Sequence, residues 1–391
     1  MGGQSIFDGG VAENLCRLIN EFGLEIQSDT ISLDHAYFTG EKLIPSHELF
    51  PSVDPDFLKK RLDIIQKKSS SMLEVLNTLF DATDPAFTCY AVRLAGYEGA
   101  PVEKLSSHYT ETLYHMLLGG ISSAHQESTV ELASIKGGNS LLPEKLAQDL
   151  GDRIHLNAPL ASVSKALGGA YSLLFQNGDT ANADILVLAI PCSTYTDIRF
   201  EETVIPFERL AAIQSVPYGT NAKILLPVSG APQKRITLIN DRMGAFCDAN
   251  CDILTCYYTG ESGKFSADTI NDTLIQDQPM LDLRYSYSSW TAPVMARDES
   301  FIQYQGPVGY SWPNDPYVKG SYSYIAPGQD ILLTATIEVD GETTKTLFSP
   351  IGNTLYFAGE HASILQDVPG TLEAACESGE RAARMVVKRY H

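Results

Sequence analysis

The sequence contains no apolar run long enough to cross a membrane and no segment typical of secretion. A transmembrane helix needs about 18 to 20 predominantly apolar residues, and no stretch of the chain approaches that length. The N-terminus lacks both the basic and the apolar region of a signal peptide. We therefore expect no membrane span and, on this ground alone, a cytoplasmic protein.

Positive charge is also scarce. The chain has 28 Lys and Arg residues against 48 Asp and Glu residues, a formal net charge of −20. Such a surface repels phosphates, which argues against nucleic acid as a partner. An acidic surface is compatible with cationic substrates such as amines, although its commoner role is to keep a protein in solution.

The seven cysteines form no framework of disulfides or metal ligands. Their odd number and scattered positions favour a reducing compartment. Cys247, Cys251 and Cys256 cluster, but their spacing, with no nearby His, fits no common zinc pattern. We expect ordinary thiols and no metal site.

The C-terminal segment is the most informative part of the sequence. Residues 355–358 form a short apolar run that ends at Gly359-Glu360, and an amphipathic run begins at Thr371 after a loop. This order predicts a strand, a turn with an acid, and a helix N-terminus, which suits a polyhydroxylated, phosphorylated cofactor. The alternative is an ordinary helix with Thr371 as its cap.

Helical and strand-like patterns alternate through the rest of the chain. Helical spacing predicts a helix within 11–26 that ends at Gly23, helices over 56–82 and 103–118, and a short helix that ends near Leu150. Strand-like runs follow at 154–156, 170–175 and 185–190, with Asn177-Gly178 as a hairpin signal between the last two. The run that stops at Pro191 is apolar throughout, as expected for a strand buried on both faces.

The texture of the sequence changes at several boundaries. Residues 201–335 are rich in Tyr, Ser and Pro with short alternating runs such as Ala222 to Val228, which predicts a mostly antiparallel sheet with some helix. The 391 residues, 44% of them hydrophobic, suffice for two domains. We expect an α/β fold, α+β overall, in which nucleotide-type segments (1–28, 131–200 and 336–391) are interrupted by two insertions (29–130 and 201–335).

Six segments, in order, resemble the flavin-dependent amine oxidase family. They are Asp8-Gly9-Gly10 with the helix after it, Gly137 to Asn157, Ala183 to Pro191, Val216 to Lys223, Trp312 with Gly320-Ser321-Tyr322, and the C-terminal segment. The resemblance implies a Rossmann-like FAD-binding domain built from the three nucleotide-type segments. The insertions would form a substrate domain of mixed antiparallel sheet and helices.

The resemblance also implies which residues hold the cofactor. They are Gly2, Gly3, Gly10, Leu160, Pro191, Gly359, Glu360, Thr371 and Leu372. Glu360 can accept hydrogen bonds from ribityl or ribose hydroxyls, and the helix dipole at Thr371 and Leu372 favours negative charge on a reduced flavin. Ser321 stands where some relatives carry a cysteine bonded to the flavin, so the FAD is expected to be non-covalent.

Three further residues are implied to act near the reacting atoms. Lys223 matches a lysine that holds a water beside flavin N5 in relatives, and Trp312 and Tyr322 match aromatic residues that wall the substrate cavity. The alternatives are a strand lysine that reaches solvent and aromatic residues of an ordinary core. Thr371 stands where some relatives have a second cage tyrosine, so a two-tyrosine cage is not expected.

One part of the family pattern is missing. The sequence contains no GxGxxG turn, whose glycines let a helix N-terminus hold the pyrophosphate, and Gln4 stands where relatives often have Arg. Three explanations remain open. The sequence is a piece of a longer or cleaved protein, a separate polypeptide supplies the missing βαβ unit, or the protein has lost FAD.

The expected function is FAD-dependent oxidation of an amine or amino acid by dioxygen, giving an imine, then a carbonyl, ammonia and hydrogen peroxide. An amino-acid substrate would need an arginine for its carboxylate, and Arg93, Arg284 and Arg297 are available. The alternatives are a non-enzymatic scaffold of the same fold that no longer binds FAD, and a related flavin enzyme such as a desaturase.

Overall fold

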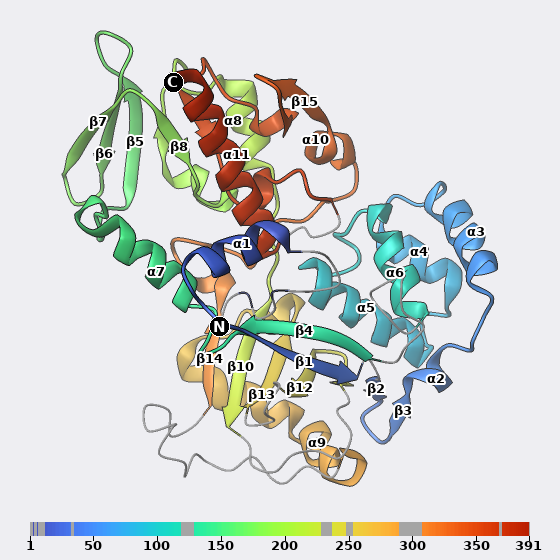
Figure 1. Ribbon diagram of the computed structural model, residues 1–391. Helices are drawn as coiled ribbons and strands as arrows, with labels where there is room; N and C mark the ends of the chain where they lie inside the picture. The colour runs from blue at the N-terminus through green and yellow to red at the C-terminus, as the bar shows by residue number, and fades with distance from the viewer. Residues whose placement is uncertain are drawn as a thin grey trace. The chain divides into compact units, whose positions relative to one another are not determined.

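The computed structural model describes residues 3, 6, 12–32, 35–118, 129–227, 237–247, 253–288, 307–366 and 370–390. The chain folds as two units (Figure 1). Unit 1 contains Asp29–Leu132 and Tyr218–Gly328, and unit 2 contains Gly2–Ser28, Ala133–Pro217 and Gln329–His391. The chain thus changes unit after residues 28, 132, 217 and 328. The assignment of a cofactor role or a substrate role to these parts of the chain stays a prediction.

Unit 1 is built on a seven-stranded sheet. In spatial order its strands are β14 (Val308–Ser311), β10 (Ala222–Pro227), β13 (Ile253–Tyr258), β12 (Met243–Cys247), β11 (Thr237–Ile239), β2 (His35–Phe38) and β3 (Leu43–Pro45). Neighbours are antiparallel except β11 and β2, which run parallel. The mostly antiparallel sheet predicted for residues 201–335 is confirmed, and β2 and β3 from the first insertion extend it.

Strand β10 contributes to an apolar core on one face of this sheet. Successive side chains of a strand point to opposite faces. Ala222, Ile224 and Leu226 join an apolar cluster with residues of β12, β13 and helix α9 (Ile270–Ser288). Lys223 therefore lies on the opposite face, which also carries its two cross-strand neighbours.

The helices of unit 1 surround a second apolar core. They are α2 (Ser46–Leu49), α3 (Pro55–Gln66), α4 (Met72–Leu79), α5 (Pro85–Glu98) and α6 (Thr110–Leu117), drawn blue to cyan in Figure 1. Asp54, Ser71 and Asp84 cap the N-termini of α3, α4 and α5 with their side chains. Helix α6 is shorter than the helix predicted for 103–118, because a 3₁₀ turn at Ser107–Tyr109 precedes it.

The single helix predicted for residues 56–82 is wrong. The chain leaves the helix after α3 and starts α4 in a new direction at Met72. The Ser71 hydroxyl accepts the Glu74 N–H at 3.4 Å, and the Glu74 carboxylate accepts the Ser70 N–H at 2.7 Å. The first bond caps one N–H of the first turn of α4, and the second fixes the chain just before the helix, so both stabilise the break.

Unit 2 combines three small sheets with helices. A four-stranded sheet has the order β7 (Thr180–Ala183), β6 (Tyr171–Phe175), β5 (Leu160–Lys165) and β9 (Arg199–Phe200). β8 (Leu186–Leu188) pairs in parallel with β17 (Leu355–Phe357), and β15 (Thr336–Val339) forms a hairpin with β16 (Glu342–Lys345). The helices are α1 (Glu13–Glu21), α7 (Leu141–Leu150), α8 (Phe207–Gln214), α10 (Asp330–Thr334) and α11 (Leu372–Tyr390). β1 (Ile26–Ser32) and β4 (Thr129–Ile135) pair where the chain changes unit.

Three predictions for this unit need correction. Residues 154–156 are not a strand, and the strand begins instead at Leu160. The Asn177-Gly178 turn joins β6 to β7 and not to the apolar run at 185–190. That run contains β8, which pairs with distant β17. Val187 of that run is 43% exposed, so β8 is not buried on both faces. Local periodicity cannot identify a pairing partner some 170 residues away in the sequence.

Two expectations about the whole chain can be checked within the described residues. None of their helices is long and apolar enough to span a bilayer. The cysteines in the described part of the chain carry free thiols. The described residues contain no group of three or more His, Cys, Asp or Glu side chains that could hold a metal ion. Cys251 lies outside this part of the chain.

Candidate functional site

The ends of two parallel strands lie together in unit 2. Leu186 and Leu188 of β8 pair with Leu355 and Phe357 of β17, and the Ala358 N–H donates to the Leu188 carbonyl at 3.0 Å. Pro191 follows the end of β8, and Gly359-Glu360 follows the end of β17. Crevices outside the carboxyl ends of parallel strands are the usual ligand sites of such sheets.

Gly359 makes a turn that no other residue fits without strain. Its φ is +117°, and a Cβ at this position would lie 2.6 Å from the His361 ring. The Gly359 N–H donates to Ser378 Oγ at 2.9 Å, and this hydroxyl lies 2.8 Å from the Gly359 carbonyl. One buried hydroxyl of α11 therefore fixes the backbone at the strand end.

The 3₁₀ turn η9 (Glu360–Ala362) is held by buried charged side chains. Arg381 Nη2 donates to the Ala362 carbonyl at 2.7 Å, and Lys345 Nζ donates to the His361 carbonyl at 2.9 Å. Arg381 Nε also donates to the Glu377 carboxylate at 2.7 Å. Burial lowers the pKa of Lys345, and the Glu360 carboxylate opposes this effect by favouring the ammonium. Glu360 thus extends from a turn whose backbone is fixed beside a buried cation.

The N-terminus of α11 combines a cap with two N–H groups available to a ligand. Thr371 Oγ1 accepts the Ala374 N–H at 3.2 Å, so the capping role of Thr371 is real. The N–H groups of Leu372 and Glu373 have no acceptor within the helix because of their positions in its first turn. The cap leaves these two donors to other groups, so it is compatible with a cofactor here.

Sequence reasoning missed Glu373. Its carboxylate accepts the Asn14 N–H at 3.1 Å, the Asn14 amide at 2.6 Å and the Leu15 N–H at 2.7 Å. Helix α1 has no side-chain cap of its own, so the acid of α11 caps it. The signal in the sequence was an acid next to apolar residues in a helix's first turn, but its partner lies 359 residues away.

Of the other predicted cofactor residues, Gly3 lies near the start of α11, whereas Leu160 lies in another sheet of unit 2. The Gly3 carbonyl accepts the Asn139 side-chain amide at 2.9 Å, and a Cβ on Gly3 would lie 2.8 Å from Leu372 Cγ. Leu160 begins β5, in a different sheet from β8 and β17, so its cofactor contact stays a prediction. Gly2 and Gly10 lie outside the described residues.

Unit 1 gathers the predicted catalytic side chains around β10. Lys223 lies directly opposite Tyr257 of β13 and Tyr310 of β14, so the three side chains share one face of the sheet. Lys223 Nζ lies over the Tyr257 ring, 5.2 Å from its centroid. The Trp312 ring packs against Tyr310, with centroids 4.5 Å apart.

Tyr322 and Asn221 close the C-terminal end of α5. The Tyr322 hydroxyl lies 2.9 Å from the Gly96 carbonyl and 3.0 Å from the Tyr97 carbonyl. Asn221 Nδ2 lies 2.8 Å from that hydroxyl and 3.2 Å from the Gly96 carbonyl. Burial, with the neighbouring Tyr257 hydroxyl, raises the pKa of Tyr322 well above its ordinary value, so the phenol stays a neutral donor. The hydroxyl of Tyr322 has a structural role whether or not its ring contacts a substrate.

Two of the segments that carry the family resemblance meet in space. The Gly219 N–H donates to the Tyr322 carbonyl and the Ser321 N–H donates to the Gly219 carbonyl, both at 2.8 Å. A Cβ on Gly219 would lie 2.2 Å from the Gly99 carbonyl oxygen, so glycine is required for this approach. The structure thus brings Lys223, Trp312, Ser321 and Tyr322 into one neighbourhood of unit 1, while their chemical roles stay predictions.

Of the three candidate arginines, only Arg93 has a described side chain. Its Nη1 lies 3.1 Å from His35 Nε2, and its guanidinium lies over the Tyr90 ring, 5.5 Å from the centroid. Arg93 is therefore already engaged by protein groups. The side chain of Arg284 and all of Arg297 lie outside the described part.

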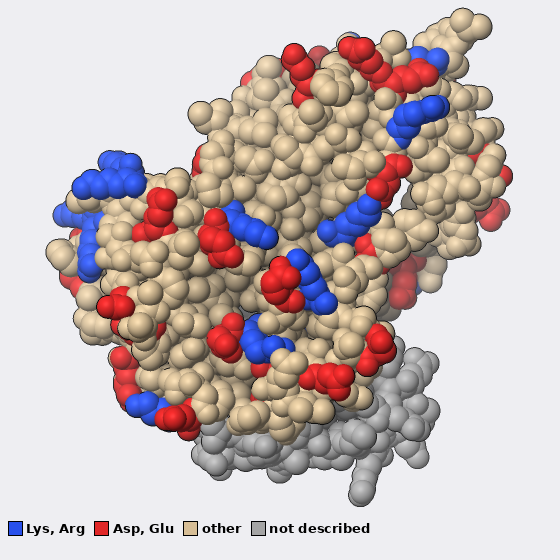
Figure 2. Space-filling model, turned by 180° about the vertical axis from the view of Figure 1, so that it is seen from behind, with Lys and Arg blue, Asp and Glu red and all other residues tan. Residues whose placement is uncertain are grey.

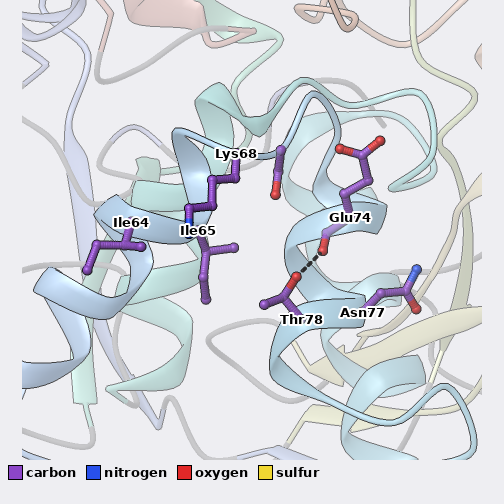
Figure 3. A pocket seen from close by; sticks show the side chains of 7 residues that line it. Ile64, Ile65, Lys68, Glu74, Asn77 and Thr78 are labelled. Atoms are coloured by element: carbon purple, nitrogen blue, oxygen red, sulfur yellow. Dashed lines mark hydrogen bonds between the residues drawn. The ribbon is translucent and has the colours of Figure 1, made fainter.

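A hollow of about 450 Å³ opens between α3 and α4 (Figure 3). Its lining residues are Ile64, Ile65, Lys68, Ser69, Glu74, Asn77 and Thr78. Thr78 Oγ1 donates to the Glu74 carbonyl, a bond within α4. The lining contains none of the predicted site residues, so this hollow is not part of the candidate site.

The chain is similar to known proteins of one enzyme family. A family model described as flavin containing amine oxidoreductase matches residues 1–387. An L-amino-acid oxidase of Demansia vestigiata is 26% identical in an alignment of 271 residues that covers 64% of this chain and 47% of that protein. The match thus spans about half the length of this curated relative.

Solved structures show the same fold at low sequence identity. Wild-type putrescine oxidase bound to putrescine has a TM-score of 0.70 at 17% identity, with 99% of this chain and 88% of that chain covered. Cyclohexylamine oxidase from Brevibacterium oxydans IH-35A has a TM-score of 0.69 at 18% identity, with 98% and 87% covered. The predicted fold class is confirmed. None of these comparisons supports a separate polypeptide that supplies a missing unit.

Proposed function

Because the chain belongs to the flavin-containing amine oxidoreductase family, we propose that it oxidises an amine or an amino acid with non-covalently bound FAD. Proteins of this family are FAD-dependent oxidoreductases. The single observation that carries the proposal is the strand, turn and helix of unit 2, in which Gly359, Glu360 and the start of α11 follow the paired strands β8 and β17.

The residues at this position fit the flavin end of FAD. The glycine permits the turn after β17 and the close approach of the His361 ring, Glu360 supplies an acceptor for hydroxyl groups, and Leu372 and Glu373 present N–H donors at a helix N-terminus. Ser321 cannot form the thioether that attaches flavin covalently in some relatives. We propose that Gly359, Glu360, Thr371 and Leu372 hold the cofactor.

When bound, FAD would supply the two-electron redox chemistry that couples oxidation of the amine to an imine with reduction of dioxygen to hydrogen peroxide. Water hydrolyses the released imine to a carbonyl and ammonia. The protein's own groups bind, orient and exclude water. Lys223 would donate a hydrogen bond to a water at the reacting centre. Trp312 and the ring of Tyr322 would form a dry wall that orients the amine.

The two candidate substrate classes differ in the carboxylate that an amino acid carries. Amino acids need a cation for the carboxylate, whereas simple amines do not. Arg93 is engaged with His35 and Tyr90, so it is a poor candidate for that task. The relatives named above include an amino-acid oxidase and amine oxidases, and we therefore propose both classes as candidates.

The test is to purify the chain, incubate it with FAD, remove free cofactor and record the absorbance in the blue. We expect a yellow protein that produces peroxide with a member of a panel of putrescine, cyclohexylamine and L-amino acids. A colourless protein would contradict the proposal and favour a scaffold without cofactor. A yellow protein that forms no peroxide with any of them would favour another flavin reaction, such as desaturation.

A further inference from the structure

We propose that Tyr257 is a positioning residue that holds the Lys223 ammonium in place through its aromatic ring. Tyr257 did not stand out in the sequence, since the local pattern of its strand, β13, is ordinary. The role of Lys223 in catalysis rests on the proposed function, but the positioning itself does not depend on it.

The register of the sheet brings the two side chains together. Lys223 and Tyr257 are directly opposite in the antiparallel pair β10–β13, an arrangement that places side chains on the same face at about 5 Å. The ammonium nitrogen lies 5.2 Å from the ring centroid. This distance lies within the range in which a ring face attracts a cation.

The ring is itself fixed by buried groups. Asn221 is 0% exposed, and its Nδ2 lies 3.0 Å from the Tyr257 hydroxyl. The same nitrogen lies 3.2 Å from the Ala95 carbonyl and 2.8 Å from the Tyr322 hydroxyl. A chain of contacts therefore runs from the end of α5 through Asn221 to the Tyr257 hydroxyl, and through the ring to the lysine.

The body of the ring also lies near the backbone of α5. An ideal Cβ on Gly96 would lie 3.8 Å from Tyr257 Cδ1 and Cε1, so the helix backbone passes close to the ring. A lysine has four rotatable bonds and loses much entropy when it is fixed. A ring that cannot move gives the ammonium a defined position, which a lysine needs if it is to hold one particular water.

Tyr310 provides a matched control on the other neighbouring strand. It also lies directly opposite Lys223, but its hydroxyl donates to Asp315 and its ring packs against Trp312. Substitution of either tyrosine by leucine removes one aromatic neighbour of Lys223. Only the Tyr257 change removes the ring beneath the ammonium.

The experiment measures the reactivity of the Lys223 amine in the full chain without FAD. Wild type, Tyr257→Leu and Tyr310→Leu are labelled with a trace of acetic anhydride at fixed pH, and the Lys223 peptide is quantified by mass spectrometry. We expect Tyr257→Leu to raise the labelling rate about threefold, because the ammonium loses its attraction to the ring and becomes accessible. Tyr310→Leu is expected to raise it less, and Tyr257→Phe to keep the rate close to wild type.

A labelling rate that does not change in folded Tyr257→Leu would overturn the proposal. If that variant does not fold, Tyr257→Gln replaces it, since it also removes the ring face and puts a polar side chain near the buried amide of Asn221. In the FAD-loaded enzyme, the same change is expected to lower kcat with little effect on KM. A chain that binds no FAD would defeat the proposed function and leave the labelling result to decide the role of Tyr257.

Discussion

At the scale of single residues, the turn after β17 depends on polar side chains that have little access to water. Arg381 is 2% exposed and Glu377 is 7% exposed, and together they bond to the backbone or side chains of Ala362, Ser363 and Ile364. Buried ion pairs contribute little to stability on average, but removal of one partner leaves the other uncompensated. Here Arg381 and Glu377 hold the backbone of the turn from which the Glu360 side chain extends.

His361 makes this turn sensitive to acid. Burial, with the positive charge of Lys345, lowers the pKa of His361 to about 3, while an unfolded histidine titrates near 6.5. The unfolded chain therefore binds a proton first, and this residue's contribution to stability is complete above pH ~6.5 and decreases as the pH falls towards 3.

We expect the free energy of unfolding to drop by about 2 kcal/mol between pH 6.5 and 5 through this one residue. His361→Gln should remove that part of the pH dependence, as measured by urea unfolding at several pH values. Equal slopes for wild type and variant over this range would show that His361 is not buried in its neutral form.

At the scale of elements, α1 and α11 are joined at their N-termini. Glu373 accepts three hydrogen bonds from the first turn of α1, and Leu15 and Ile19 of α1 pack in the same apolar cluster as Leu372. The helix end proposed to face the cofactor is thereby connected to a second helix.

We expect Glu373→Ala to lower the free energy of unfolding by about 2–3 kcal/mol, because buried N–H donors lose a charged acceptor. Glu13→Gln is the matched control, since this exposed acid lies in the same first turn and should cost less than ~0.5 kcal/mol. Urea unfolding followed by circular dichroism compares the two. Equal effects would mean that Glu373 does not cap α1.

The elements also show what the sequence could and could not predict. The segment from Leu355 to Tyr390 was predicted well because strand, glycine turn and amphipathic helix are all local patterns. The break between α3 and α4 was predictable in principle, since Ser71 and Glu74 have the spacing of a capping box. Apolar residues at helical spacing on both sides of the break concealed this signal.

The site itself was only partly predictable. Gly359 and Lys223 are distinctive in their local sequence, one as a glycine after a strand and the other as a charge in an apolar strand. Asn221, Tyr257 and Glu373 act through partners that lie 36 to 359 residues away, so their roles depend on sheet register and helix packing. A single sequence does not contain this information in local form.

At the scale of the whole molecule, acidic residues outnumber basic ones, but the face drawn in Figure 2 has no large patch of negative charge. Figure 2 shows Lys and Arg interspersed with Asp and Glu on the face that it draws. A net charge of −20 nevertheless imposes self-repulsion on the folded state.

We expect Tm to rise by about 2 °C when NaCl is increased from roughly 10 mM to 150 mM, since screening relieves this repulsion. Differential scanning calorimetry measures the change, and choline chloride at equal ionic strength serves as control because it supplies the same screening without sodium. A lower Tm in salt would mean that the surface ion pairs contribute more than the repulsion costs.

The cap that Glu373 gives to α1 has a consequence for synthesis of the protein. Helix α1 leaves the ribosome before its acceptor, which follows 359 residues later. At about 5–20 residues per second, the apolar side of α1 waits on the order of 20–70 s for α11. During that time Leu15 and Ile19 are apolar surfaces that a chaperone can bind, and this cluster of unit 2 is completed only when α11 is made.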